Sequence, residues 1–168
     1  MTPTNEDSRD RISWGKNGQY MVKEGCKRLS TDLETNVRLW KKVWHPDSIP
    51  KVNSFIWTLM HNKLLMAENL RKRGIAGPSQ CALCNSEAET SNHIFLQCSV
   101  SLKVWQCVLP LGLHFKPPDS MAQLLEDWTN HFPGNLNKNP ILRHLWNSIP
   151  KNLCWQLWMA RNKIIFKD

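Results

Sequence analysis

Three cysteines and one histidine lie close together in the middle of the chain, and their spacing limits what this region can form. Cys81 and Cys84 are separated by two residues, His93 follows after eight more, and Cys98 after a further four. Zinc favours this donor set, because it binds thiolate sulfur at about 2.3 Å and imidazole nitrogen at about 2.0–2.1 Å in a tetrahedron. The short first gap lets one tight turn direct two thiolates at one ion. The spacing therefore predicts a zinc site, and four protein ligands make such a site structural, not catalytic.

The same residues have two other interpretations. Cys81 and Cys84 are spaced like a thioredoxin-type redox pair, but such a pair normally begins a helix after a strand, and here a loop containing Pro78 and Ser79 precedes it. The second interpretation is that the cysteines are unrelated buried thiols beside a core histidine. The retroviral zinc knuckle has the same ligand order and outer gaps but a shorter central gap, so its mode of base stacking is not carried over to this chain.

The composition indicates a folded chain with a substantial core. The 168 residues include 41% hydrophobic residues and nine tryptophans, which is enough apolar surface to offset chain entropy. No apolar run reaches the roughly 18–20 residues of a membrane span, and the polar start lacks the basic-then-apolar order of a signal peptide. We expect an intracellular protein, nuclear or cytoplasmic, in which the six cysteines do not form a disulfide framework.

Positive charge is concentrated in one stretch of the sequence. The net charge is +8, and residues 38–73 contain eight basic but only two acidic residues. An excess of this kind favours an acidic partner such as nucleic acid, although surplus lysine also serves solubility. The candidate contacts for RNA or DNA flank helices whose other faces are apolar and must turn inward. They are Lys51, Lys63, Arg71, Lys72 and Arg73.

The spacing of apolar residues predicts a mostly α fold, a small helical domain with an inserted zinc-knuckle-like loop. The best-defined helix begins at Pro50, which suits a first helical position. A second helix over about 65–73 is followed by Gly74, a natural C′ residue. A short N-terminal β-hairpin over 12–22 is a further expectation. The remaining predicted helices cover residues 36–45, 100–109, 117–128, a short segment at 142–146, and a final segment that starts at Pro150.

Several short segments on both sides of the cysteine–histidine set carry a resemblance to a known family. They are Ile49-Pro50-Lys51-Val52, Phe55-Ile56-Trp57, Glu68 to Ile75, Glu87, Glu89-Thr90 and Val104-Trp105, with Asp10, Trp14, Gly18, Tyr20, Val22 and Lys23 upstream and Trp155, Trp158, Arg161-Asn162 and Phe166 downstream. Together with the zinc ligands they resemble the zinc-binding domain of plant LINE-type (non-LTR retrotransposon) reverse transcriptases. The resemblance covers about residues 10–168.

This resemblance implies a zinc-binding region that lies between a polymerase and a ribonuclease H and assists nucleic-acid engagement. It divides the chain into a disordered start (1–9), the zinc-binding domain (10–110, with a zinc loop at 78–100), and a helical extension (111–168) like the segment before a ribonuclease H domain. The sequence departs from the family at Leu65-Met66, where Pro-Thr is usual. The hydroxyl cap of the second helix is therefore missing, at a cost of about 1 kcal/mol.

The sequence contains no recognisable catalytic set. It has no aromatic-Ala-Asp-Asp polymerase motif and no carboxylate set of a ribonuclease H, and the adjacent Glu126 and Asp127 diverge on their helix. We therefore expect no enzyme. Two functions remain. One is a zinc-binding accessory module that binds RNA or DNA with little sequence preference and has no membrane or small-molecule partner. The other is a zinc-stapled structural or protein-interaction domain with no nucleic-acid role of its own.

Overall fold

The computed structural model describes residues 37–46, 48–77, 79–109, 113–131 and 139–166, and in these residues the fold is mostly α, as predicted. The chain divides into two units, residues 1–38 and 39–168, and the second contains the core and the cysteine–histidine set. The disorder predicted for residues 1–9 and the hairpin predicted over 12–22 both lie outside the described residues. The described elements are α2 (Val37–Val43), α3 (Pro50–Met60), α4 (Ala67–Lys72), the π-helix η2 (His93–Gln97), α5 (Ser99–Val108), α6 (Met121–Asp127), the 3₁₀ helix η3 (Trp128–His131) and α7 (Pro140–Phe166).

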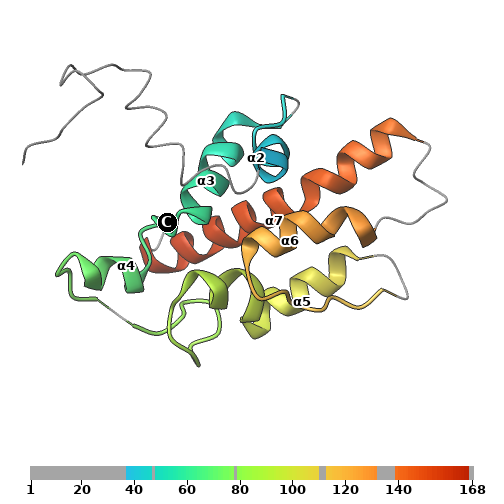
Figure 1. The fold of residues 1–168 in the computed structure, drawn as a ribbon. Coiled ribbons are helices and arrows are strands. Elements are labelled where there is room, and N and C mark those ends of the chain that lie inside the picture. Colours follow the sequence, from blue (N-terminus) through green and yellow to red (C-terminus); the bar gives the residue numbers. More distant parts are fainter. Residues whose placement is uncertain (1–36, 47, 78, 110–112, 132–138, 167–168) are drawn as a thin grey trace, which may run out of the picture. The chain divides into compact units, whose positions relative to one another are not determined.

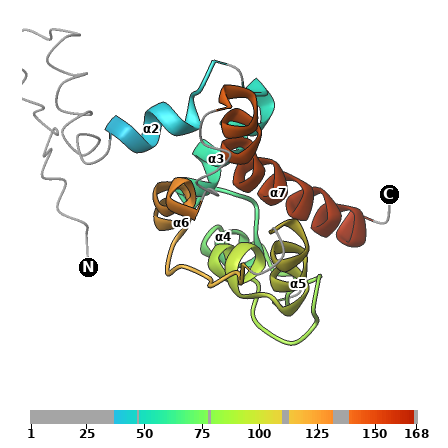
Figure 2. The ribbon, with the colours of Figure 1, turned by 90° about the vertical axis from the view of Figure 1, so that its right-hand side faces the viewer.

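The centre of the core lies where α3 packs against α7 (Figures 1 and 2). As predicted, α3 begins with Pro50 and buries one apolar face. The ring of Phe55 on this face lies 5.2 Å from that of Trp155 on α7 and 6.0 Å from that of Phe95 on η2, both at edge-to-face angles. Phe55 thus joins α3 to α7 and to the segment that carries the zinc ligands. None of the described helices is both long enough and apolar enough to cross a membrane.

The C-terminal region forms one helix, which corrects the prediction of a short helix at 142–146 and a second one starting at Pro150. Instead, α7 runs for 27 residues with Pro150 inside it. Proline has no N–H, so the carbonyl of Trp146 loses its usual helical partner. The Trp128 Nε1–H donates to that carbonyl at 2.9 Å, and the Trp146 Nε1–H donates to the Trp128 carbonyl at 3.1 Å. The helix continues through the proline because a tertiary contact replaces the missing bond.

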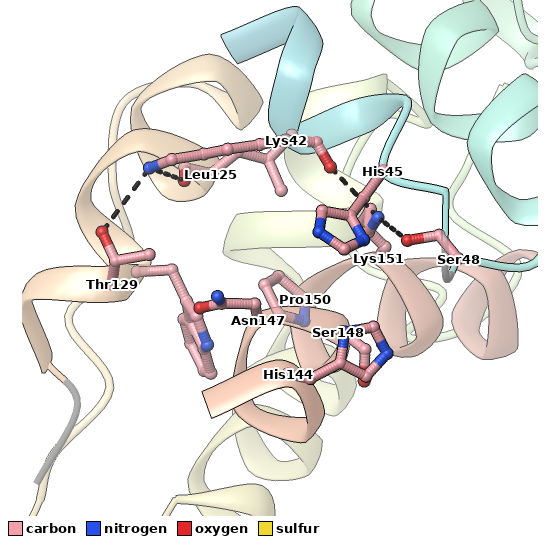
Figure 3. A pocket seen from close by; sticks show the side chains of 11 residues that line it. Lys42, His45, Ser48, Leu125, Thr129, His144, Asn147, Ser148, Pro150 and Lys151 are labelled. Atoms are coloured by element: carbon pink, nitrogen blue, oxygen red, sulfur yellow. Dashed lines mark hydrogen bonds between the residues drawn. The ribbon is translucent and has the colours of Figure 1, made fainter. Parts of the chain in front are cut away.

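Two lysines close the ends of helices from other parts of the fold (Figure 3). Lys42 on α2 donates to the carbonyls of Leu125 and Glu126 at the end of α6, at 3.1 and 3.0 Å. Lys151 on α7, only 4% exposed, donates to the Lys42 carbonyl at 3.1 Å and to the Ser48 hydroxyl. Burial lowers the pKa of Lys151. Both ammonium groups satisfy helix C-terminal carbonyls, which carry partial negative charge. Lys151 is therefore an interior cation, and the half-buried Lys42 is used within the fold.

The replacement of a helical bond by Trp128 can be tested with two substitutions. Trp128→Phe removes the Nε1 donor, and we expect it to lower the free energy of unfolding by about 1–3 kcal/mol because a buried acceptor loses its partner. In a Pro150→Ala background the new backbone N–H of residue 150 can donate to the Trp146 carbonyl. Trp128→Phe should then lower the free energy of unfolding by about 1 kcal/mol less than it does in the wild-type background. Urea denaturation of both single variants and the double variant measures the difference. Equal costs in the two backgrounds would contradict the exchange of partners.

Candidate metal centre

The four predicted ligands come together in the zinc loop. One ligand atom from each of Cys81, Cys84, His93 and Cys98 lies within 4.8 Å of all the others. The Cys81 and Cys98 sulfurs are 3.9 Å apart, and the Cys84 sulfur is 3.2 Å from His93 Nε2. Two sulfurs bound to one tetrahedral zinc at about 2.3 Å lie about 3.8 Å apart, so the donor set and its spacing fit this ion. Three of the four residues are buried and Cys84 is half-buried.

A tight turn directs the first two ligands. The Cys81 N–H donates to the Glu87 carbonyl and the Glu89 N–H to the Ser79 carbonyl, both at 2.8 Å, on either side of an antiparallel bridge between Gln80 and Ala88. The turn closes at Asn85, whose φ of 55° lies in the left-handed region that asparagine tolerates better than most residues. This hairpin-like geometry places the two thiols on the same side of the turn.

The two thiols of the turn differ in acidity. Burial raises the pKa of Cys81 to about 12, although the N–H groups of Cys84 and Leu83 donate to its sulfur. Desolvation also opposes ionisation of Cys84, but hydrogen bonds from the Ser86 and Glu87 N–H groups, together with His93 and Cys81, lower its pKa to about 6. Metal-bound cysteine is a thiolate, and a cation at the centre stabilises that form of every thiol in the cluster. The backbone donors therefore suit a bound metal.

The other two ligands lie at the two ends of a π-helix that the spacing of residues did not predict: His93 begins it and Cys98 is its C-cap residue. Cys98 donates its N–H to the His93 carbonyl at 2.7 Å, the i to i+5 bond of a π turn. In this geometry two residues five positions apart lie about one turn from each other. The side chains of His93 and Cys98 therefore point toward the same side of the π-helix. Between them, Ile94, Phe95 and Leu96 are fully buried in the core. The apolar run was visible in the sequence, but π-helices are too rare for its spacing to indicate one.

A buried carboxylate connects the zinc loop to the rest of the fold. Glu89 is 2% exposed, and Arg161 on α7 donates to it through Nε at 3.2 Å and through an Nη at 2.5 Å. The same carboxylate accepts the N–H of Ala67, the first residue of α4, at 2.9 Å. The N-cap residue Met66 has no side-chain cap, as the departure from the family pattern predicted. Glu89, a residue remote in sequence, supplies the acceptor that a local hydroxyl would provide.

The predicted nucleic-acid contacts do not form one continuous group. Lys51 lies in the first turn of α3, with its ammonium 5.1 Å from the ring centre of Trp155, and Lys63 lies beyond the opposite end of this helix. A helix of 11 residues is about 16 Å long. Arg71, Lys72 and Arg73 are exposed at the C-terminal end of α4, so the structure keeps these three together.

The metal content should depend on the four ligands and not on other cysteines. We expect the wild-type chain to bind one zinc ion and Cys98→Ser to lose it, because a serine hydroxyl is a poor substitute for a thiolate at a zinc site. Cys107→Ser is the matched control, since Cys107 is exposed on α5. Elemental analysis of the purified proteins gives the stoichiometry. Retention of a full equivalent by Cys98→Ser would refute the ligand set.

The buried ion pair should contribute far more to stability than an exposed one. Glu89→Gln leaves the guanidinium of Arg161 buried without its counter-charge, and we expect a loss of about 3 kcal/mol in the free energy of unfolding. Glu68→Gln is the control, because Glu68 pairs with Lys72 at 2.7 Å on the exposed side of α4, and it should cost less than about 0.5 kcal/mol. Denaturant titration measures both values, and similar losses would argue against a structural role for Glu89.

The comparisons with known proteins agree with this geometry. No curated protein and no solved structure matches the chain. A family model described as zinc-binding in reverse transcriptase matches residues 20–105, just over half of the chain. The matched residues include Cys81, Cys84, His93 and Cys98, the cluster that fits zinc. The chain therefore belongs to the family of zinc-binding domains of reverse transcriptases.

Proposed function

We propose that this chain is a non-catalytic accessory module of a reverse transcriptase of the plant LINE type, and that it binds RNA or DNA with little sequence preference. Cys81, Cys84, His93 and Cys98 hold the zinc in this proposal. The proposal also includes two predictions from the sequence. These are a division into domains at 10–110 and 111–168, and a nuclear or cytoplasmic location. The observation that supports nucleic-acid binding best is the cluster of exposed cations at the end of α4, which we name the basic ridge (Arg71, Lys72 and Arg73).

The zinc loop is well placed to orient the basic ridge. α4 receives its N-terminal acceptor from Glu89, which is part of the zinc loop. α4 and the zinc loop also line a common cavity of about 260 Å³, to which Leu70, Gln80 and Ala82 contribute. A metal that fixes the loop therefore also limits how α4 can move. This arrangement gives zinc a role in binding without direct contact between the ion and the nucleic acid.

The three cations of the basic ridge are not equivalent. Lys72 donates to Glu68 at 2.7 Å, and this bond lowers the pKa of Glu68. Part of the charge of Lys72 is thus balanced within α4. Arg71 and Arg73 carry planar guanidinium groups that can bind phosphate oxygens in pairs. We therefore assign most of the phosphate contacts of the ridge to the two arginines.

A specific observation also favours the second candidate function, a structural or protein-interaction domain. The cavity between α4, the zinc loop and α7 is partly lined by Ile75 and Ile164, whose side chains are exposed. Phe166, near the end of α7, is exposed as well. Exposed apolar groups around a cavity suit a protein partner better than a phosphate backbone. Salt-dependent binding to nucleic acid distinguishes the two functions, because contacts to phosphate release counterions.

We expect Arg71→Ala combined with Arg73→Ala to weaken binding to an RNA or DNA strand. The slope of log K against log salt concentration should become shallower by about 1.4 for single strands or 1.8 for duplex, since each lost contact accounts for about 0.7 or 0.9. Titrations between about 50 and 200 mM salt measure this slope. Lys103→Ala combined with Lys116→Ala is the control, because both lysines are exposed outside the ridge. No binding by the parent at about 50 mM salt would leave the structural function as the better account.

A further inference from the structure

Three rings from α2 and α3 stack on one another outside the zinc loop. The ring of His61, the C-cap residue of α3, lies 5.3 Å from that of Trp40 on α2 at an interplanar angle of 25°. It also lies 4.5 Å from the ring of Trp57, at a tilted angle of 38°. The imidazole thus contacts both indoles. We name this group the ring stack (Trp40, His61 and Trp57).

The ring stack is anchored at one end and open at the other. Trp40 is half-buried and packs against the hydrophobic core. The orientation of the central ring is fixed, because His61 Nδ1 donates to the Trp57 carbonyl at 2.8 Å. Trp57 ends the stack and is 43% exposed. A large apolar ring held in place at the surface is available to a further planar group without a loss of side-chain freedom on binding.

The charges near the ring stack are those of a surface that accepts an anion. Neither α2 nor α3 contains an aspartate or a glutamate. Glu68, which interacts with Asn62 next to His61, is paired with Lys72 at 2.7 Å. Lys41, next to Trp40 in the chain, is exposed, and so is Lys63, which follows α3. A cationic surface around an aromatic ring is the combination by which proteins bind single-stranded nucleic acid without sequence preference. A protein partner would gain from the positive charge only if its own surface were acidic, whereas every nucleotide of a strand carries a phosphate.

We infer that the ring stack is a base-stacking site for single-stranded RNA or DNA, with Trp57 as the residue in contact with the base. The inference rests on the proposed nucleic-acid binding and specifies the form of the partner. In a duplex the faces of the bases are covered by their neighbours, whereas an unpaired base can stack on the exposed indole. The basic ridge supplies contacts to phosphate, and the ring stack supplies contacts to bases.

The experiment compares two ligands of equal length and charge, an oligothymidylate and an abasic strand with the same phosphates. Trp57→Ala should weaken binding of the zinc-loaded full chain to oligothymidylate about tenfold, as expected for the loss of one stacked base. Its binding to the abasic strand should equal that of the parent. Trp57→Phe keeps an aromatic ring and should retain most of the affinity. Circular dichroism checks that the variants fold.

A matched control is Trp44→Ala, because Trp44 is also exposed but makes no ring contact within the described part of the chain. It should bind both strands as the parent does. An equal loss for Trp44→Ala, or no loss for Trp57→Ala, would overturn the inference even if salt-dependent binding through Arg71 and Arg73 remained. Absence of binding to either strand by the parent would instead overturn both this inference and the proposed function. Preference of the parent for the base-containing strand that is lost in Trp57→Ala would support the inference.

Discussion

The buried carboxylate of Glu89 holds three parts of this fold together: the zinc loop, α4 and α7. It meets the guanidinium of Arg161 on α7 and the first N–H of α4 while almost fully removed from water. A charge in this position is tolerated only when its oxygens are fully hydrogen-bonded and a counter-charge is present. Both conditions are met only if the zinc loop, α4 and α7 hold their places together. The requirement is directional, so it fixes relative positions in a way that apolar burial alone does not.

The metal centre and the hydrophobic core are parts of one structure. The π-helix that begins at His93 and is capped by Cys98 also places three successive apolar residues in the core. Its buried carbonyls are satisfied from α5, because Ser101 donates to the Ile94 carbonyl and the Trp105 indole donates to the Phe95 carbonyl at 2.7 Å. The position of the metal ligands is therefore coupled to α5 through these hydrogen bonds. It is coupled to α3 through the contact between the rings of Phe95 and Phe55.

What the sequence predicted correctly depends on neighbours in the chain. The ligand set follows from a fixed spacing, α3 from a proline start and an apolar face, and the end of α4 from Gly74, whose φ of 74° requires a left-handed conformation. What the sequence did not show depends on partners far away. The proline inside α7 is tolerated because of Trp128, the N-terminus of α4 is capped by Glu89, and Lys42 turns inward to α6. Such partners cannot be predicted from the spacing of neighbouring residues in the sequence.

The position of α7 has a consequence for where this unit can be cut. The family match ends at residue 105, whereas α7 begins at Pro140. Yet Lys151 closes the end of α2, Arg161 neutralises Glu89, and Trp155 covers Phe55. A recombinant fragment that stopped at the limit of the match would lack Trp155, which packs on Phe55, and Arg161, the counter-charge of Glu89. The segment that the family model matches is thus shorter than the segment that these contacts hold together.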